Sequence, residues 1–124
     1  MDRTFVAIGA VSAFLGVALG AFAAHGLRQR LSPEMLLIFE VGVRYQMYHA
    51  LALIAVGLVL AHWPSGTVEI AGWLFLAGTA IFSGSLYALS VSGVRTLGAI
   101  TPIGGLAFLS GWIALAAGVL SARR

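Results

Sequence analysis

The residues of this chain that could bind a ligand or do chemistry form a small set in an otherwise apolar sequence. Histidine, glutamate and tyrosine can exchange protons, arginine binds phosphate and carboxylate groups, and hydroxyl and amide side chains donate and accept hydrogen bonds. The set, called the polar cluster below, is our candidate binding site: His25, Glu40, Arg44, Tyr45, Gln46, Tyr48, His49, Ser83, Ser85, Tyr87, Thr101 and Pro102.

The histidines of the polar cluster lack the setting of a metal or haem site. Neither His25 nor His49 has a second histidine or a carboxylate at the spacing of an H-E-x-x-H or E-x-x-H motif. The sequence contains no cysteine, which excludes thiolate ligands, disulfides and cysteine nucleophiles. We therefore expect neither a metal nor a cofactor.

Catalytic motifs are also weak. Ser85 lacks the second glycine of a G-x-S-x-G nucleophile elbow, and Asp2 is the only aspartate of the chain. A lipid-modifying enzyme with His25 or His49 as the base and Ser85 or Tyr48 as the nucleophile stays open, but the sequence favours a non-enzymatic protein.

The composition places the chain in a membrane. Hydrophobic residues make up 60% of the sequence and charged residues only 9%, whereas about 25% of the residues of a soluble domain are charged. The mean hydropathy of +1.02 would leave large apolar patches exposed to water. The basic residues do not form the patch of a nucleic-acid-binding protein, because they lie beside the ends of apolar runs, as Arg3, Arg28, Arg30, Arg44, Arg95, Arg123 and Arg124.

Four apolar runs are long enough to cross a bilayer. They cover about 5–24, 43–61, 70–89 and 100–120, and each approaches the roughly twenty residues that a transmembrane helix needs. The connections between them are short and contain charged residues, proline or glycine. The sequence thus predicts an all-α fold, a transmembrane four-helix bundle of antiparallel up-down neighbours, in one domain over 1–124.

The second helix is predicted to extend beyond its membrane span. Ser32 followed by Pro33 is typical of an N-cap with proline at the first helical position. A helix over 33–61 would be about 45 Å long, against about 30 Å of hydrocarbon, so its first turns lie in the interface or the helix tilts. Glu40 and Arg44 fall one turn apart there, where an ion pair can form.

An even number of crossings divides the molecule into two ends. The terminal side holds both chain ends and the connection 62–69, and the loop side holds the connections 25–34 and 93–98. The polar cluster belongs to the loop-side half. Ionisable groups at membrane depth are costly and mark candidate functional sites, although tyrosine can also belong to an interfacial belt and arginine can extend to headgroups.

One arrangement of the polar cluster would bind an anion. Thr101 as N-cap with Pro102 next would point free N–H groups and a positive helix end toward the loop side. Arg44 and Arg95 would add positive charge. We expect a site for a lipid phosphate or a small carboxylate.

Small residues recur at four-residue spacing in three of the runs. Such stripes allow membrane helices to approach closely, so they predict seams of the bundle. The stripes are Ser12, Gly16, Gly20 and Ala24; Ala80, Gly84, Ala88 and Ser92; and Ala114, Gly118 and Ala122.

Four stretches together resemble the YgdD/YwdK-like family of small bacterial inner-membrane proteins. They are 20–27 (GAFAAHGL), 39–50 (FEVGVRYQMYHA), 82–87 (FSGSLY) and 97–105 (LGAITPIGG), and the likeness covers essentially the whole chain. Ala23 stands where the family usually has glycine. The resemblance implies a four-span protein with a domain of unknown function and supplies no reaction, but its stretches coincide with the polar cluster.

The expected function is non-enzymatic binding of lipid or a small anion by a structural or accessory protein. Expected partners are membrane lipid and either further copies of the chain or a larger membrane complex, without nucleic acid. An oligomeric transporter or channel is the alternative, and a path through the membrane lined by Arg44 and Tyr48 would favour it. Arginine counts at the two ends nearly balance, and the resemblance implies cytoplasmic termini in a bacterial inner membrane.

Overall fold

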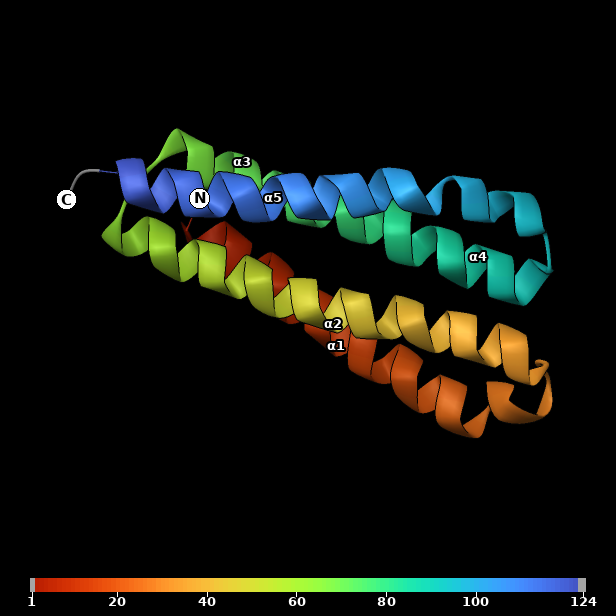
Figure 1. The fold of residues 1–124 in the computed structure, drawn as a ribbon. Coiled ribbons are helices and arrows are strands. Elements are labelled where there is room, and N and C mark those ends of the chain that lie inside the picture. Colours follow the sequence, from red (N-terminus) through yellow and green to blue (C-terminus); the bar gives the residue numbers. More distant parts are fainter. Residues whose placement is uncertain (1, 123–124) are drawn as a thin grey trace.

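The computed structural model describes residues 2–122, and the helices in this range form four long spans (Figure 1). Arg123 and Arg124 lie outside the described residues. The spans Asp2–His25, Pro33–His62, Gly66–Ser92 and Arg95–Ser121 are each apolar and long enough to cross a bilayer, which confirms the predicted all-α, four-span fold. The elements are α1 (Asp2–His25), η1 (Leu27–Gln29), α2 (Pro33–His62), α3 (Gly66–Gly78), η2 (Thr79–Ser83), α4 (Gly84–Ser92), η3 (Arg95–Ala99) and α5 (Thr101–Ser121).

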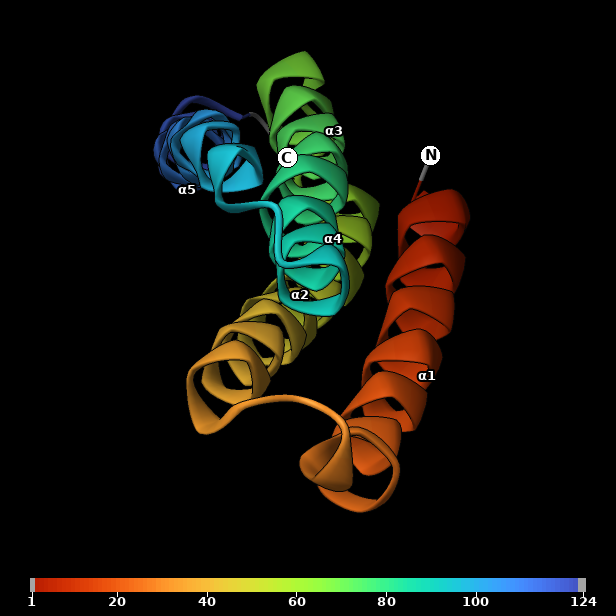
Figure 2. The same ribbon diagram turned by 90° about the vertical axis from the view of Figure 1, so that its right-hand side faces the viewer.

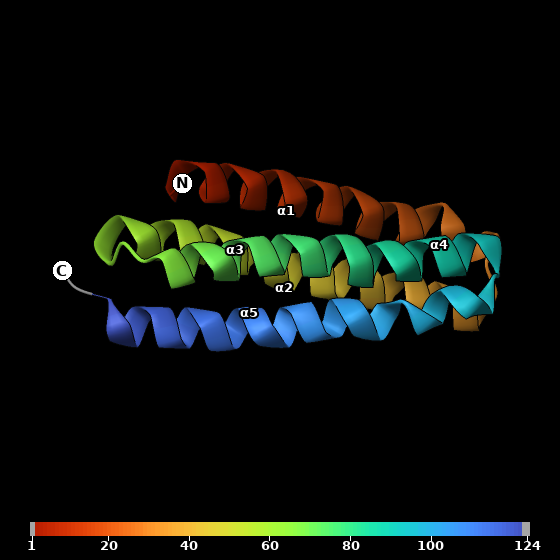
Figure 3. The same cartoon turned by 90° about the horizontal axis from the view of Figure 1, so that it is seen from above.

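The third and fourth spans are compound helices. A π-helical turn, η2, joins α3 to α4, and the short 3₁₀ helix η3 leads into α5. α2 and the compound span α3–η2–α4 form the middle of the bundle, and α1 and α5 lie on opposite sides of it (Figures 2 and 3). α1 packs mainly against α2, and α5 packs mainly against α3. The bundle is therefore open between α1 and α5.

Capping residues set the limits of α2 and α3. The Ser32 hydroxyl accepts a hydrogen bond from the Met35 N–H at 3.2 Å, and Pro33 occupies the first turn, as the sequence predicts. With 30 residues, α2 is about 45 Å long and exceeds the hydrocarbon thickness. Ser65 caps α3 in the same way, and Gly93 ends α4 with a φ of 74°, a left-handed conformation that suits glycine.

Glycines form the contact surface between α5 and the third span. Large side chains of one helix lie opposite glycines of the other, so that an added methyl group at each glycine would overlap the facing residue. The pairs follow one antiparallel register: Val68 with Gly118, Phe75 with Gly111, Gly78 with Phe108, and Phe82 with Gly104.

Two of the three predicted small-residue stripes contribute to seams. Gly16 and Gly20 of the first stripe face α2, where Gly16 lies against Met47, and Gly118 of the last stripe faces α3. The stripe of the third span is not a seam. An added Cβ at Gly84 meets no atom within 4 Å, and Ala80 and Ala88 are exposed, because η2 turns this face away from the neighbouring helices.

The π-helical turn was not predicted, and it changes which face of the third span is buried. Val68 and Phe75, two buried residues, are seven positions apart, as on a regular packed helix. The next fully buried residue, Ser83, follows after eight positions, and Ser90 after another seven. The extra residue of η2 thus rotates α4 so that Ser85 and Ser90, instead of Ala88 and Ser92, face the bundle.

Candidate functional site

The structure divides the polar cluster into an inner and an outer group. Gln46, His49, Ser83 and Ser85 are buried, and Tyr87 and Thr101 are half-buried beside them. The side chains of the outer group are exposed: His25, Glu40, Arg44, Tyr45, Tyr48 and Pro102. The cluster is therefore not one pocket, and the two groups have different chemistry available to them.

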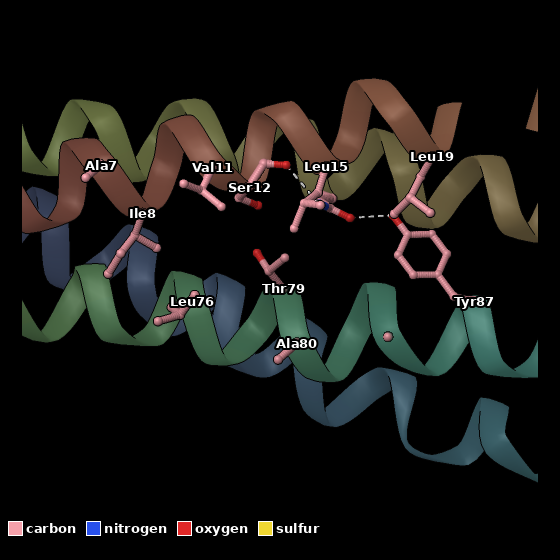
Figure 4. Close-up of a pocket in the computed structure, with 12 residues that line it drawn as sticks. Ala7, Ile8, Val11, Ser12, Leu15, Leu19, Leu76, Thr79, Ala80 and Tyr87 are labelled. Carbon is pink, nitrogen blue, oxygen red and sulfur yellow. Dashed lines mark hydrogen bonds between the residues drawn. The ribbon is translucent and has the colours of Figure 1, made fainter. Parts of the chain in front are cut away.

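Gln46 connects three helices in the inner group. Its Nε2 donates to the Ser12 carbonyl oxygen of α1 at 2.9 Å, and its Oε1 accepts from the Tyr87 hydroxyl of α4 at 2.5 Å (Figure 4). This arrangement, called the Gln46 clasp below, satisfies both ends of a buried amide. The sequence identified Gln46 and Tyr87, but the Ser12 acceptor is a backbone group that side-chain patterns do not show.

Ser83, the last residue of η2, and Gly42 hold the third span close to α2. The Ser83 hydroxyl donates to the Gly42 carbonyl oxygen at 2.6 Å, and both residues are buried. An added Cβ at Gly42 would lie 2.7 Å from the Tyr87 ring, so a larger residue there would displace that ring. Ser83 thus has a structural partner rather than a free hydroxyl.

Thr101 bonds to a neighbouring helix and does not cap its own. Its hydroxyl lies 2.6 Å from that of Ser85, which also donates to the Phe82 carbonyl. α5 has no side-chain N-cap, since η3 runs into it and the Ile103 N–H bonds to the Ile100 carbonyl at 3.0 Å. The predicted cap is therefore wrong, and the anion site loses its free helix end, although Pro102 occupies the first turn as expected.

His49 bridges α2 and α5 as a neutral side chain. Its Nδ1 lies 2.8 Å from the Tyr45 carbonyl oxygen, which can only accept, so Nδ1 carries the proton. Its Nε2 then accepts from the Trp112 indole N–H at 3.1 Å. The imidazole also stacks on Phe108 with ring centroids 3.6 Å apart. Both nitrogens are occupied, and the sequence did not indicate Trp112 as a partner because it lies 63 positions from His49.

The inner group is internally satisfied. Within residues 2–122, no buried side-chain nitrogen or oxygen lacks a hydrogen-bond partner. Hydrogen bonds between membrane helices stabilise the bundle, and here they join α1, α2, α4 and α5. The inner group therefore holds the helices together, and ligand binding falls to the exposed residues.

The outer group follows one face of α2. Glu40, Arg44 and Tyr48 are one turn apart and all exposed, and the Tyr45 and Tyr48 rings meet edge to face at 5.6 Å. The described side chains show no ion pair between Glu40 and Arg44. His25 is exposed at the loop-side end of α1.

Arg95 is already neutralised by an acidic partner. Two of its nitrogens contact the two Glu34 oxygens at 2.9 and 3.3 Å, a pairing of residues far apart in the chain that the sequence did not indicate. Arg95 was expected to add positive charge to the site, and this pairing leaves Arg44 as the free cation of the outer group within the described range.

Two of the surface grooves between neighbouring spans are lined in part by residues of the polar cluster. The α2–α5 groove has a volume of about 520 Å³ and is lined by aromatic residues, with Tyr45 and Pro102 toward its loop-side end and Leu109 and Trp112 deeper in the membrane. The α1–α4 groove, about 580 Å³, runs between α1 and the third span. Neither groove was predicted, because each depends on the spacing between helices.

Comparisons with known proteins find relatives over most of the chain. The family described as "Protein of unknown function (DUF423)" matches residues 19–105. The chain is 48% identical to the UPF0382 membrane protein YwdK of Bacillus subtilis, over 90% of this chain and 91% of the relative. It is 47% identical to the UPF0382 membrane protein SH2409 of Staphylococcus haemolyticus, over 91% and 92% of the two chains. No solved structure matches.

Proposed function

The chain belongs to the DUF423 family of membrane proteins, and we propose that it is a non-enzymatic accessory protein that binds an anionic phospholipid at its loop-side face. The proposal follows from the position of Arg44. This residue and His62 are eighteen positions apart on α2, which corresponds to about 27 Å, close to the thickness of the hydrocarbon. With His62 at the terminal-side boundary, Arg44 lies at the loop-side boundary.

An exposed arginine at this depth needs a negatively charged partner. Arg44 has no acidic side chain bonded to it among residues 2–122, so a lipid phosphate is the partner that its surroundings supply. Guanidinium and phosphate groups form bidentate, charge-assisted hydrogen bonds. The exposed Tyr45 and Tyr48 rings lie at the same level, where tyrosine commonly meets headgroups.

The α2–α5 groove gives the same lipid a place for its chain. It begins at Tyr45, the neighbour of Arg44 in the sequence, and continues past Leu106 and Leu109 to Trp112. A phospholipid with its phosphate on Arg44 could lay one chain along this groove. The combination of charge at the boundary and an apolar groove below it matches the two parts of a phospholipid.

Binding is better supported than transport. A transport path within one copy would need Arg44 and Tyr48 to line an interior passage, but both side chains lie on the outer face of α2. The interior polar groups are bonded to one another. We further propose that the termini are cytoplasmic, so that Arg44 faces the extracytoplasmic leaflet. A C-terminal reporter that is active only when exported should be inactive.

Native mass spectrometry can test the lipid proposal. The purified protein is titrated with phosphatidylglycerol or phosphatidylcholine of identical chains, and lipid adducts are counted. Both lipids offer a phosphate to Arg44, but in phosphatidylcholine the choline cation lies beside that phosphate and repels the guanidinium. We therefore expect phosphatidylglycerol to bind about tenfold more tightly. Arg44→Gln should remove the preference, whereas Arg30→Gln, a loop-side control, should keep it. An unchanged preference in Arg44→Gln refutes the proposal, and displacement by inorganic phosphate alone would indicate a small-anion site.

A further inference from the structure

The α1–α4 groove is a second feature that the phospholipid site does not use. One wall is formed by apolar residues of α1, and the other by Leu76 and Ala80 of the third span and by Gly84 (Figure 4). Gln46 and Tyr87 of the Gln46 clasp line its inner surface. This groove and the α2–α5 groove lie on different sides of the contact between α2 and the third span.

Both ends of the α1–α4 groove are blocked by packed side chains. Toward the terminal side, Phe5 of α1 is fully buried against Gly72, and its ring meets Trp73 with centroids 5.1 Å apart. Toward the loop side, two lining residues, Leu19 and Tyr87, pack onto the cluster of Ala23, Leu27 and Phe39. The groove therefore opens sideways into the hydrocarbon, and an occupant must enter from there.

The size of the groove fits a thread-like occupant. It follows α1 from Ala7 to Leu19, about 18 Å, so a volume of about 580 Å³ corresponds to a mean cross-section of about 30 Å². An α-helix with its side chains has a cross-section of about 80 Å² or more. A helix of a second copy could place only part of its width in the groove, whereas one extended hydrocarbon chain can lie wholly within it.

The Tyr87, Gln46 and Thr79 side chains that line the groove already have hydrogen-bond partners within the protein. The Tyr87 hydroxyl and the Gln46 amide bond to each other and to the Ser12 carbonyl, and the Thr79 hydroxyl donates to the Phe75 carbonyl at 2.9 Å. A ligand with its own polar group would find these donors engaged. Apart from the Ser12 hydroxyl, the remaining lining is apolar, which suits a plain chain.

We propose that the α1–α4 groove binds one acyl chain of a membrane lipid, whatever its headgroup. The Gln46 clasp ties α1 to α2 and α4 at the groove, and the π-helical turn supplies Thr79 and Ala80 to its wall. π-helical turns are frequent at functional sites. The groove lies between the blocked ends, away from the exposed Arg44, so this site is independent of the phospholipid site.

Filling the groove tests the proposal. Gly84 lines it and has no atom within 4 Å of an added Cβ, so Gly84→Phe can enter the space without overlapping the core. Ala88→Phe is the matched control, because Ala88 is exposed on the same span but lines neither groove. Ala80→Leu is a second variant with the same purpose, since Ala80 is exposed and lines the groove.

The readout is electron spin resonance of chain-labelled phosphatidylcholine in phosphatidylcholine vesicles, with circular dichroism to confirm folding. Gly84→Phe and Ala80→Leu should each lose one motionally restricted chain per protein relative to the wild type. Ala88→Phe should keep the same number of restricted chains as the wild type. Arg44→Gln should also keep it, which separates this site from the phospholipid site.

Two outcomes would overturn the proposal. Equal numbers of restricted chains in the wild type, Gly84→Phe and Ala80→Leu would show that the groove holds no lipid chain. A wild-type particle in detergent that contains two copies, reduced to one copy by Gly84→Phe in light scattering, would show that the occupant is a second protein.

Discussion

Two adjacent glycines of α5 allow the packing between α5 and the third span to be tested directly. A Cβ added to Gly104 would lie 2.5 Å from the Phe82 amide nitrogen and 2.8 Å from its Cα. These are backbone atoms, which side-chain rotation does not move away. Gly105, the next residue, has no atom within 4 Å of an added Cβ. The variants Gly104→Ala and Gly105→Ala thus differ in contact but share the helix, the depth and the chemical change.

The expected difference can be estimated from the structure. Each replacement gains about 1 kcal/mol of helix propensity on the scale measured in water, and this gain cancels between the two variants. The overlap at Gly104 forces α5 away from Phe82 and costs about 1–3 kcal/mol, as overpacking of a close contact does. The unfolding free energy of Gly104→Ala should therefore be about 1–3 kcal/mol lower than that of Gly105→Ala. Gly105→Ala should be at least as stable as the wild type.

Both variants can be unfolded reversibly in mixed micelles with increasing dodecyl sulfate. Circular dichroism then gives the unfolding free energy of each under the same conditions. Trp112 fluorescence gives a second signal from the same helix and checks that the transition is cooperative. The reasoning about the register is refuted when the two variants unfold at the same detergent fraction, or when Gly105→Ala is the less stable one.

Two further predictions concern the inner hydrogen bonds. Tyr87→Phe removes the donor to Gln46 Oε1 and should lower the unfolding free energy by about 0.6–1.7 kcal/mol, as hydrogen bonds between membrane helices do. A double-mutant cycle with Gln46→Leu in the same assay should give a coupling free energy of this size. Additive effects of the two substitutions would contradict the bond. Nitrogen NMR should find His49 protonated at Nδ1 and unprotonated at Nε2, and Trp112→Phe should shift the Nε2 resonance alone. An Nε2-protonated imidazole in the wild type would contradict the assignment.

The sequence predicted the four spans and the limits of α2 for reasons that are local. Twenty consecutive apolar residues have no stable place except a bilayer or a core, and a chain of this composition has no polar surface to cover such a core. Ser32 and Pro33 determine the start of α2 through their own backbone and hydroxyl groups. Such features need no knowledge of neighbouring helices.

The features that the sequence did not predict all depend on partners distant in the chain. Ser85 bonds both to the Phe82 carbonyl of its own span and to Thr101, and the Thr101 contact follows from the distance between α4 and α5. Arg95 and Glu34 are separated by 61 positions and meet only because two loop-side segments are adjacent. The π-helical turn at Thr79–Ser83 leaves no local signal, because each of its residues is also acceptable in an α-helix.

Helical periodicity nevertheless predicts which residues of the polar cluster share a face of α2. Glu40, Arg44 and Tyr48 repeat every four residues and so share a face, whereas Gln46 and His49 share another with Gly42. Gly42 is buried against α4, which identifies its face as the inward one. Groups on that face are bonded to other helices, so a change there affects stability first. Groups on the outward face meet lipid, so Arg44 can be altered with little effect on folding, and its role in binding can be measured separately from the integrity of the bundle.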